Sequence, residues 1–158
     1  MENTAVLMVC FGNICRSPTA EGVLRHLARH EAPSLDLSID SAGTSDYHLG
    51  APPDERSQHH ARLRGIEIGD LRARQIAPRD YRDFDLILAM DRENLRSLKQ
   101  RVPLDGRARL KLFMEYAPDL KEVDVPDPYY GDAAGFERVL DLTTAAARGL
   151  LKALQQRA

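Results

Sequence analysis

The sequence feature that most constrains the fold is an apolar segment, residues 4–9, which is aliphatic after its first residue. A strand that is apolar on both faces is typical of a parallel sheet covered by helices. The loop that follows contains Gly12 and Asn13, residue types that accept a positive φ angle. Ser17 then suits the N-cap, and Pro18 the first position, of the helix after the loop.

Strand and helix patterns alternate along the rest of the chain. Parallel neighbours in a sheet need crossover connections, so the alternation predicts an α/β fold with a parallel sheet and helices on both faces. No repeat or linker interrupts the pattern, so we expect residues 1–158 to form a single domain. The expected strands are residues 4–9, 35–41, 84–90 and 108–113, and the expected helices are residues 18–30, 54–64, 91–99 (with Asp91 as N-cap) and 136–154.

The composition limits which classes of partner, and which cellular compartment, we expect for the protein. The 158 residues carry a formal net charge of −2, which provides no attraction to nucleic acid or to an anionic membrane. No segment approaches the roughly 18 apolar residues of a membrane span, and residues 1–3 lack the basic character of a signal peptide. We therefore expect a cytoplasmic protein with no nucleic-acid and no membrane partner. Its two cysteines, Cys10 and Cys15, are too few for a disulfide-stapled fold, and we expect them to be reduced.

The loop after the first strand, residues 10–18, carries the strongest chemical signal. It lies at the carboxyl end of a strand, where open α/β sheets bind ligands. Backbone N–H groups of such a loop point inward, and the following helix adds a positive dipole end, so the loop predicts a cradle for an anion such as phosphate. Arg16 can add a bidentate contact to two phosphate oxygens. The sequence contains neither a Walker A motif nor a G-x-G-x-x-G motif.

Cys10 begins this loop and would face the bound anion. The positive field of the cradle stabilises a thiolate, and a thiolate that faces a phosphorus atom is a nucleophile for phosphoryl transfer. Ser17 can donate a hydrogen bond to that thiolate. The alternative is that Cys10 is an inert buried thiol at a strand end.

Cleavage of a phosphate ester also needs an acid, because an alkoxide or phenoxide is a poor leaving group. Asp127 is the best candidate, since Pro126 and Pro128 stiffen its loop and fix its direction. Tyr129 and Tyr130 add aromatic walls that suit a flat substrate. Taken alone, these residues also fit an ordinary proline-rich turn, so the acid interpretation depends on the cysteine loop.

Five short motifs are spread along almost the whole chain. They are Cys10-Phe11-Gly12-Asn13-Ile14-Cys15-Arg16-Ser17-Pro18, Asp40-Ser41-Ala42-Gly43-Thr44, Gly50-Ala51-Pro52-Pro53-Asp54, Ala89-Met90-Asp91 and Asp127-Pro128-Tyr129-Tyr130-Gly131. With these motifs the chain resembles the low-molecular-weight protein tyrosine phosphatase family. The resemblance implies a single domain with a four-stranded parallel sheet, flanked by helices, and a phosphate-binding loop after the first strand.

The resemblance also implies roles for the residues of the site. Cys10 would form a phosphocysteine intermediate, and Arg16 would bind the phosphoryl oxygens and stabilise the transition state. Asp127 would protonate the leaving phenol and then activate water. Asn13 and Ser41 would hold the loop in its strained shape.

The remaining expectations concern the substrate and its surroundings. The family implies no metal ion and no organic cofactor, with phosphotyrosine-containing proteins as partners, and we expect a monomer. His26 and His30 lie four apart without an obvious third ligand, so we expect them to face solvent. Phe11 stands where many members carry a smaller residue, and His48 is a further candidate for the cleft. The expected substrate-binding residues are Phe11, Gly12, Asn13, Ile14, Cys15, Ser17, Tyr47, Tyr129 and Tyr130.

Three other functions share parts of this pattern. Thioredoxin-linked arsenate reductases have a similar first loop but need further cysteines near the middle of the chain, and none follows Cys15 here. Protein arginine phosphatases usually carry Thr where Ile14 stands, and Ile14 favours an aromatic phosphoester. A phosphate-binding module without turnover would have little need of an acid at Asp127. Two interpretations of Cys15 stay open. The family resemblance implies that it can form a reversible disulfide with Cys10, and the alternative is that it is a buried structural thiol.

Overall fold

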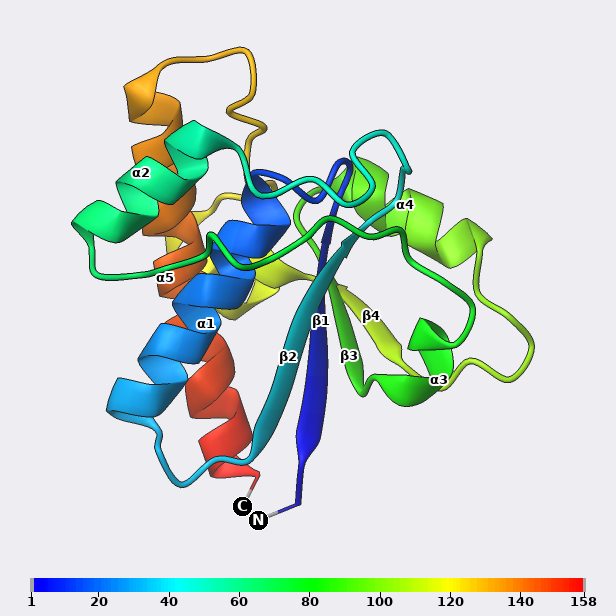
Figure 1. Ribbon diagram of the computed structural model, residues 1–158. Helices are drawn as coiled ribbons and strands as arrows, with labels where there is room; N and C mark the ends of the chain where they lie inside the picture. Colours follow the sequence, from blue (N-terminus) through cyan, green and yellow to red (C-terminus); the bar gives the residue numbers. More distant parts are fainter. Residues whose placement is uncertain (1, 158) are drawn as a thin grey trace.

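The computed structural model describes residues 2–157 and contains one four-stranded sheet (Figure 1). The strand order is β2-β1-β3-β4 and every pairing is parallel, which confirms the predicted architecture. Because β1 is central, its carboxyl end lies between those of β2 and β3. The strands are β1 (Thr4–Cys10), β2 (Leu37–Gly43), β3 (Leu86–Ala89) and β4 (Arg109–Leu112).

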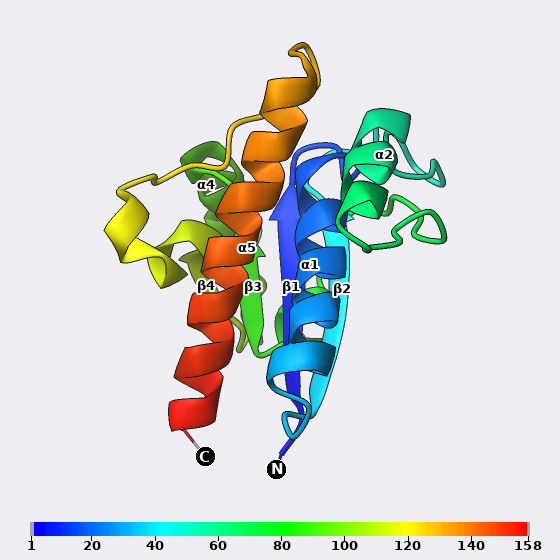
Figure 2. The ribbon, with the colours of Figure 1, turned by 90° about the vertical axis from the view of Figure 1, so that its left-hand side faces the viewer.

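Helices cover both faces of the sheet, as the sequence predicts (Figures 1 and 2). They are α1 (Arg16–Glu31), α2 (Glu55–Leu63), α3 (Asp80–Asp83), α4 (Arg92–Gln100), α5 (Ala133–Gln156) and the short 3-10 helices η1 (Phe113–Tyr116) and η2 (Pro118–Leu120). α1 and α5 pack together on one face, α3 and α4 lie on the other, and α2 packs against α1 and α5. Within residues 2–157, each helix is too short or too polar to cross a lipid bilayer.

Both faces of β1 are buried, which explains why its sequence is apolar without interruption. Val6 and Met8 point toward α1 and α5, whereas Leu7 and Val9 point toward the opposite face, where Tyr81 of α3 also packs. All four strand residues have no exposed surface. Successive side chains of a strand alternate between faces, so two hydrophobic cores fix β1 and, with it, the start of the loop that follows.

The predicted start of the first helix is wrong by two residues. α1 begins at Arg16 with Cys15 as N-cap, and no side chain caps it. Ser17 does not act as a cap because its hydroxyl contacts Cys10 and Asn13 instead. Pro18 is the third helical residue, a position that tolerates proline because N–H groups in the first turn have no partner within the helix. The Asp91 cap of α4 is confirmed, since its carboxylate accepts from the backbone N–H of Asn94.

α5 packs closely against η1 at Gly149, where an added Cβ atom would lie 1.8 Å from the carbonyl oxygen of Tyr116. Gly149→Ala should therefore lower the free energy of unfolding by about 1–3 kcal/mol, although alanine favours helix. Gly135→Ala on the same helix is the control, because its Cβ atom would lie 3.4 Å from Pro128. Urea unfolding measures both variants, and equal stabilities would contradict the close packing.

Candidate active site

The carboxyl ends of β1, β2 and β3 lie at the same edge of the sheet, and the loop after β1 crosses this edge (Figure 1). Backbone hydrogen bonds tie the loop to the segment after β2. The N–H groups of Thr44 and Ser45 donate to the carbonyl oxygens of Cys10 and Phe11, at 2.9 and 3.0 Å. Asp54, the N-cap of α2, donates its N–H to the carbonyl of Ile14 at 2.8 Å. Segments far apart in sequence therefore hold one loop.

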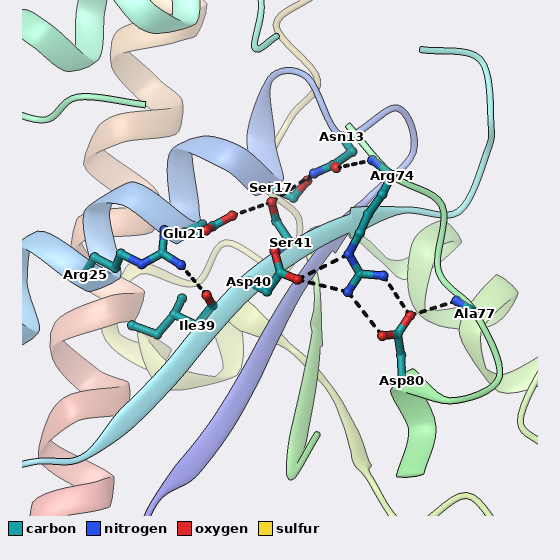
Figure 3. A network of polar contacts seen from close by, with 10 residues as sticks. All are labelled: Asn13, Ser17, Glu21, Arg25, Ile39, Asp40, Ser41, Arg74, Ala77 and Asp80. Carbon is teal, nitrogen blue, oxygen red and sulfur yellow. Dashed lines mark hydrogen bonds and ion pairs between the residues drawn. The ribbon is translucent and has the colours of Figure 1, made fainter. Parts of the chain in front are cut away.

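The buried side chain of Asn13 fixes the shape of this loop. Its φ angle is 57°, in the left-handed region that asparagine tolerates better than most residues. Its Nδ2 donates to Ser17 Oγ at 2.7 Å and to Ser41 Oγ at 3.0 Å. Its Oδ1 accepts from the backbone N–H of Arg74 at 3.0 Å. The side chain is buried, and its hydrogen bonds link the loop to α1, to β2 and to the segment before α3 (Figure 3).

The network continues from Ser41 into α1. Ser41 Oγ donates to Glu21 Oε1 at 2.6 Å, and Arg25 pairs with the other Glu21 oxygen at 2.5 Å (Figure 3). Glu21 is only 1% exposed. Burial raises its pKa above the ordinary value of 4.5, although the Ser41 hydrogen bond and the Arg25 charge act in the opposite direction. No motif in the sequence singles out this carboxylate.

The two cysteines have different surroundings. Cys10 Sγ lies 3.0 Å from Ser17 Oγ and accepts from the backbone N–H of Asn13 at 3.3 Å. Cys15 is buried, and burial together with the nearby Asp54 carboxylate raises the pKa of its thiol to about 12. Both thiols are free. A thiol with so high a pKa is a poor nucleophile at neutral pH, so Cys10 is the candidate nucleophile.

Arg16 is 4% exposed and reaches from α1 to two other segments. Its Nη1 donates to Asp91 Oδ2 at 2.6 Å and to the carbonyl oxygen of Val125 at 3.0 Å. Its Nη2 lies 3.9 Å from Asp127 Oδ2. Burial acts to lower the pKa of Arg16, but the Cys10 sulfur and these carboxylates outweigh burial and raise it. The guanidinium group therefore remains charged at the centre of the site.

The loop that carries Asp127 is held at both sides. Val125 donates its N–H to the carbonyl of Met90, just after β3, at 2.7 Å. On the other side, Arg56 of α2 donates to the carbonyl of Tyr129 at 3.0 Å. Asp127 is about half-exposed, and its Oδ1 accepts from the backbone N–H of Tyr129 at 3.1 Å. The carboxylate thus faces Arg16 from a loop that is anchored but open to solvent.

These residues surround a cavity of about 580 Å³, a usual size for a ligand site. Asn13, Ser17 and Ser41 lie outside its lining, among the buried residues beneath the loop. His48 packs on Gly12, since a Cβ atom added to that glycine would lie 3.0 Å from the imidazole. The lining consists of Cys10, Phe11, Gly12, Ile14, Cys15, Arg16, Tyr47, His48, Asp127, Tyr129 and Tyr130.

Three supporting residues were not assigned to the site from sequence, namely Glu21, Asp91 and Arg56. Asp91 was expected only as a helix cap, yet its second oxygen holds Arg16. Asp91 follows a strand that lies next to β1, and this position was the sequence signal that could have placed it near the site. Among residues 2–157, no three His, Cys, Asp or Glu side chains are arranged to hold a metal ion.

A sequence model of one known family matches residues 5–158, and that family is described as low molecular weight phosphotyrosine protein phosphatase. The chain belongs to this family. Low molecular weight protein-tyrosine-phosphatase YfkJ of Bacillus subtilis is 40% identical over 152 residues, which cover 96% of each chain. Membership of this family identifies the chain as a protein tyrosine phosphatase, which is a hydrolase. This confirms the prediction from the sequence motifs.

Solved structures of other phosphatases share the fold of this chain. A protein tyrosine phosphatase from Entamoeba histolytica matches with a TM-score of 0.91 at 35% identity, over 97% of each chain. An arginine phosphatase from Drosophila matches with a TM-score of 0.88 at 30% identity, over 94% of this chain and 96% of its own. The fold is therefore common to relatives named for different phosphorylated residues.

The raised pKa of Glu21 predicts a pH-dependent contribution to stability. The folded protein holds the Glu21 proton more tightly than the unfolded chain, so this contribution is lost as the pH rises above about 4.5, the ordinary value. Relative to Glu21→Gln, the free energy of unfolding of the wild type should fall as the pH increases from 4 toward 7.

Glu31 at the end of α1 provides the matched control. A hydrogen bond from Arg148 lowers the pKa of Glu31, so its contribution should instead grow as the pH rises toward the ordinary value of 4.5. Urea unfolding of wild type, Glu21→Gln and Glu31→Gln from about pH 3 to pH 7 measures both differences. Slopes of the same sign for the two variants would contradict the assignment.

Proposed function

We propose that the protein hydrolyses phosphotyrosine in proteins through a cysteinyl-phosphate intermediate. The observation that carries this proposal is the convergence of Cys10, Arg16 and Asp127, from three segments, on one cavity with aromatic walls. A nucleophile, a fixed cation and a carboxyl group are the groups that cleavage of a phosphate monoester requires. Family membership supports the same reaction class.

In the first step, Cys10 Sγ attacks the phosphorus atom, so that an S–P bond forms and the bond from phosphorus to the tyrosine oxygen breaks. Asp127 donates a proton to the departing oxygen. Ser17 Oγ, 3.0 Å from the sulfur, stabilises the thiolate by donating a hydrogen bond. Asp91 holds Arg16 Nη1, which leaves Nη2, on the side of Asp127, for the phosphoryl oxygens.

In the second step, the same carboxylate acts as a base. Asp127, now deprotonated, accepts a proton from a water molecule that attacks the phosphorus atom. The S–P bond breaks, its electron pair returns to Cys10, and inorganic phosphate leaves. The half-exposed position of Asp127 suits this step, because solvent water can reach its carboxylate.

The cavity walls favour an aromatic phosphoester. The rings of Phe11 and Tyr47 lie 6.1 Å apart, and Tyr129 completes the wall beyond His48. A phenyl ring can stack against such side chains. Ile14 offers no hydroxyl group to position water for attack on a phosphoramidate. The similarity to an arginine phosphatase nevertheless makes phosphoarginine the second candidate substrate. We further propose that the protein acts as a monomer on phosphotyrosine-containing proteins.

A side-by-side assay tests the substrate and the nucleophile. Peptides that contain phosphotyrosine, phosphoserine or phosphoarginine are given to the wild type and to Cys10→Ser. We expect the highest kcat/KM for phosphotyrosine, and a decrease in kcat of at least about 10⁴-fold in the variant, which should still bind inorganic phosphate. A preference for phosphoarginine would support the second candidate. Substantial turnover by Cys10→Ser would remove Cys10 as the nucleophile.

Asp127→Ala tests the acid. Phenyl phosphate needs protonation of its leaving group, so its kcat should fall by about 10²- to 10³-fold. The kcat for p-nitrophenyl phosphate should fall much less, because nitrophenolate leaves without a proton. Asp119→Ala is the control, since this carboxylate lies on η2, away from the cavity. Equal losses on both substrates would exclude Asp127 as the acid.

A further inference from the structure

The acid loop, which joins η2 to α5, is held differently on the two sides of Asp127. Both backbone groups of Val125 are bonded to other segments, the N–H to the residue after β3 and the carbonyl oxygen to a guanidinium group of α1. Residues 127–132, by contrast, make only one hydrogen bond to a distant segment of the described chain. That bond runs from Arg56 Nη2 to the carbonyl oxygen of Tyr129, at 3.0 Å.

The backbone of Tyr129 connects this anchor to the acid. Its N–H donates to Asp127 Oδ1 at 3.1 Å, while its carbonyl oxygen accepts from Arg56. The other carboxylate oxygen of Asp127 lies 3.9 Å from Arg16 Nη2, which is too far for a hydrogen bond. Tyr129 is therefore the one hydrogen-bond partner of this carboxylate among the described residues, and Arg56 holds Tyr129.

Arg56 also contacts two aromatic rings around the end of the acid loop. Its guanidinium carbon lies 5.6 Å from the centre of the Tyr129 ring and 4.7 Å from the centre of the Phe136 ring, near the start of α5. A guanidinium group over an aromatic face is attracted by the ring. Arg56 thus holds both the backbone and the ring of Tyr129, a residue that lines the catalytic cavity.

The same guanidinium group is fixed to the loop of the nucleophile through Asp54. Nε and Nη2 of Arg56 donate to the two carboxylate oxygens of Asp54, at 3.0 and 2.9 Å. These hydrogen bonds hold the pKa of Asp54 below its ordinary value, so both groups are charged at neutral pH. The backbone N–H of Asp54 in turn donates to the carbonyl of Ile14. The pair therefore joins the carbonyl of Ile14 to the carbonyl of Tyr129.

We infer that Arg56 is a positioning residue for the general acid, and that its pair with Asp54 fixes the Asp127 carboxylate relative to the Cys10 sulfur. The inference rests on the proposed function, in which Asp127 donates a proton to the leaving group. Such a transfer requires the acid to lie within hydrogen-bond reach of the departing oxygen. Arg56 lies outside the lining of the cavity, so its effect on the reaction is exerted through the acid loop.

Arg56→Met tests this role, because methionine keeps much of the length of the side chain but has no hydrogen-bond donor. The kcat/KM for phenyl phosphate should fall about tenfold, the loss expected for one hydrogen bond from a charged donor. The kcat/KM for p-nitrophenyl phosphate should fall by about twofold at most, because nitrophenolate leaves without a proton. Equal losses on the two esters would overturn the inference, since they would reflect a general disturbance of the site.

Arg148→Met is the matched control. Arg148 also donates through Nε and Nη2 to a carboxylate, that of Glu31, and both residues lie outside the catalytic cavity. This variant should hydrolyse both esters as the wild type does. A selective loss on phenyl phosphate in Arg148→Met would overturn the inference, because the loss would then follow from the removal of any surface ion pair.

Asp54→Asn tests the pair from its other side. Asparagine is as good an N-cap as aspartate and keeps the backbone N–H for Ile14, but it removes the charge that faces Arg56. We expect a selective loss of about threefold on phenyl phosphate, the size of one partly exposed ion pair. When this change is added to Arg56→Met, the loss should not increase, since both changes break the same contact. Multiplied losses in the double variant would contradict a joint action of the two residues.

Asp127→Ala, measured with the same two esters, separates failure of this inference from failure of the proposed function. If Asp127→Ala loses phenyl phosphate hydrolysis selectively and Arg56→Met does not, only the role of Arg56 is removed. If Asp127→Ala loses both esters equally, or if the wild type hydrolyses neither ester, the proposed mechanism itself fails.

Discussion

The candidate site depends on one buried amide, the side chain of Asn13. Three hydrogen bonds from this side chain join the loop to α1, to β2 and to the backbone of Arg74. They also hold the residue in the left-handed conformation that turns the loop around its ligand space. Without this amide, the backbone N–H of Arg74 would lose its partner and the hydroxyl oxygens of Ser17 and Ser41 would each lose a donor. A polar group left unpaired in the interior costs about 1–3 kcal/mol. The loop is therefore shaped by the fold before a substrate arrives, which is the condition for electrostatic stabilisation of a transition state.

Most of the fold and the chemical centre of the site could be predicted from the sequence, because their signals are local. The apolar run of β1 indicates a strand covered on both faces, and both cores are present. Cys10, Arg16 and Ser17 lie within one short segment of the sequence, so their proximity could be predicted without the topology. The N-cap was wrong for a physical reason, since the Ser17 hydroxyl contacts the cysteine sulfur instead of the helix end.

The supporting residues could not be predicted because their partners are distant in sequence. Glu21 occupies a helix position that a polar residue usually takes at the surface, and its burial follows from the position of Ser41 on β2. Arg56 contacts Tyr129 only because α2 and the acid loop meet at the same edge of the sheet.

The site combines a buried frame with exposed walls. Asn13 is 3% exposed, whereas Phe11, Tyr47 and Tyr130 are 49%, 78% and 95% exposed. Substitutions at exposed positions usually cost little stability, whereas substitutions in a buried polar network cost much. Selection can therefore exchange the wall residues and redirect such a protein to new phosphorylated targets, while the inherited machinery for breaking the phosphate ester stays intact.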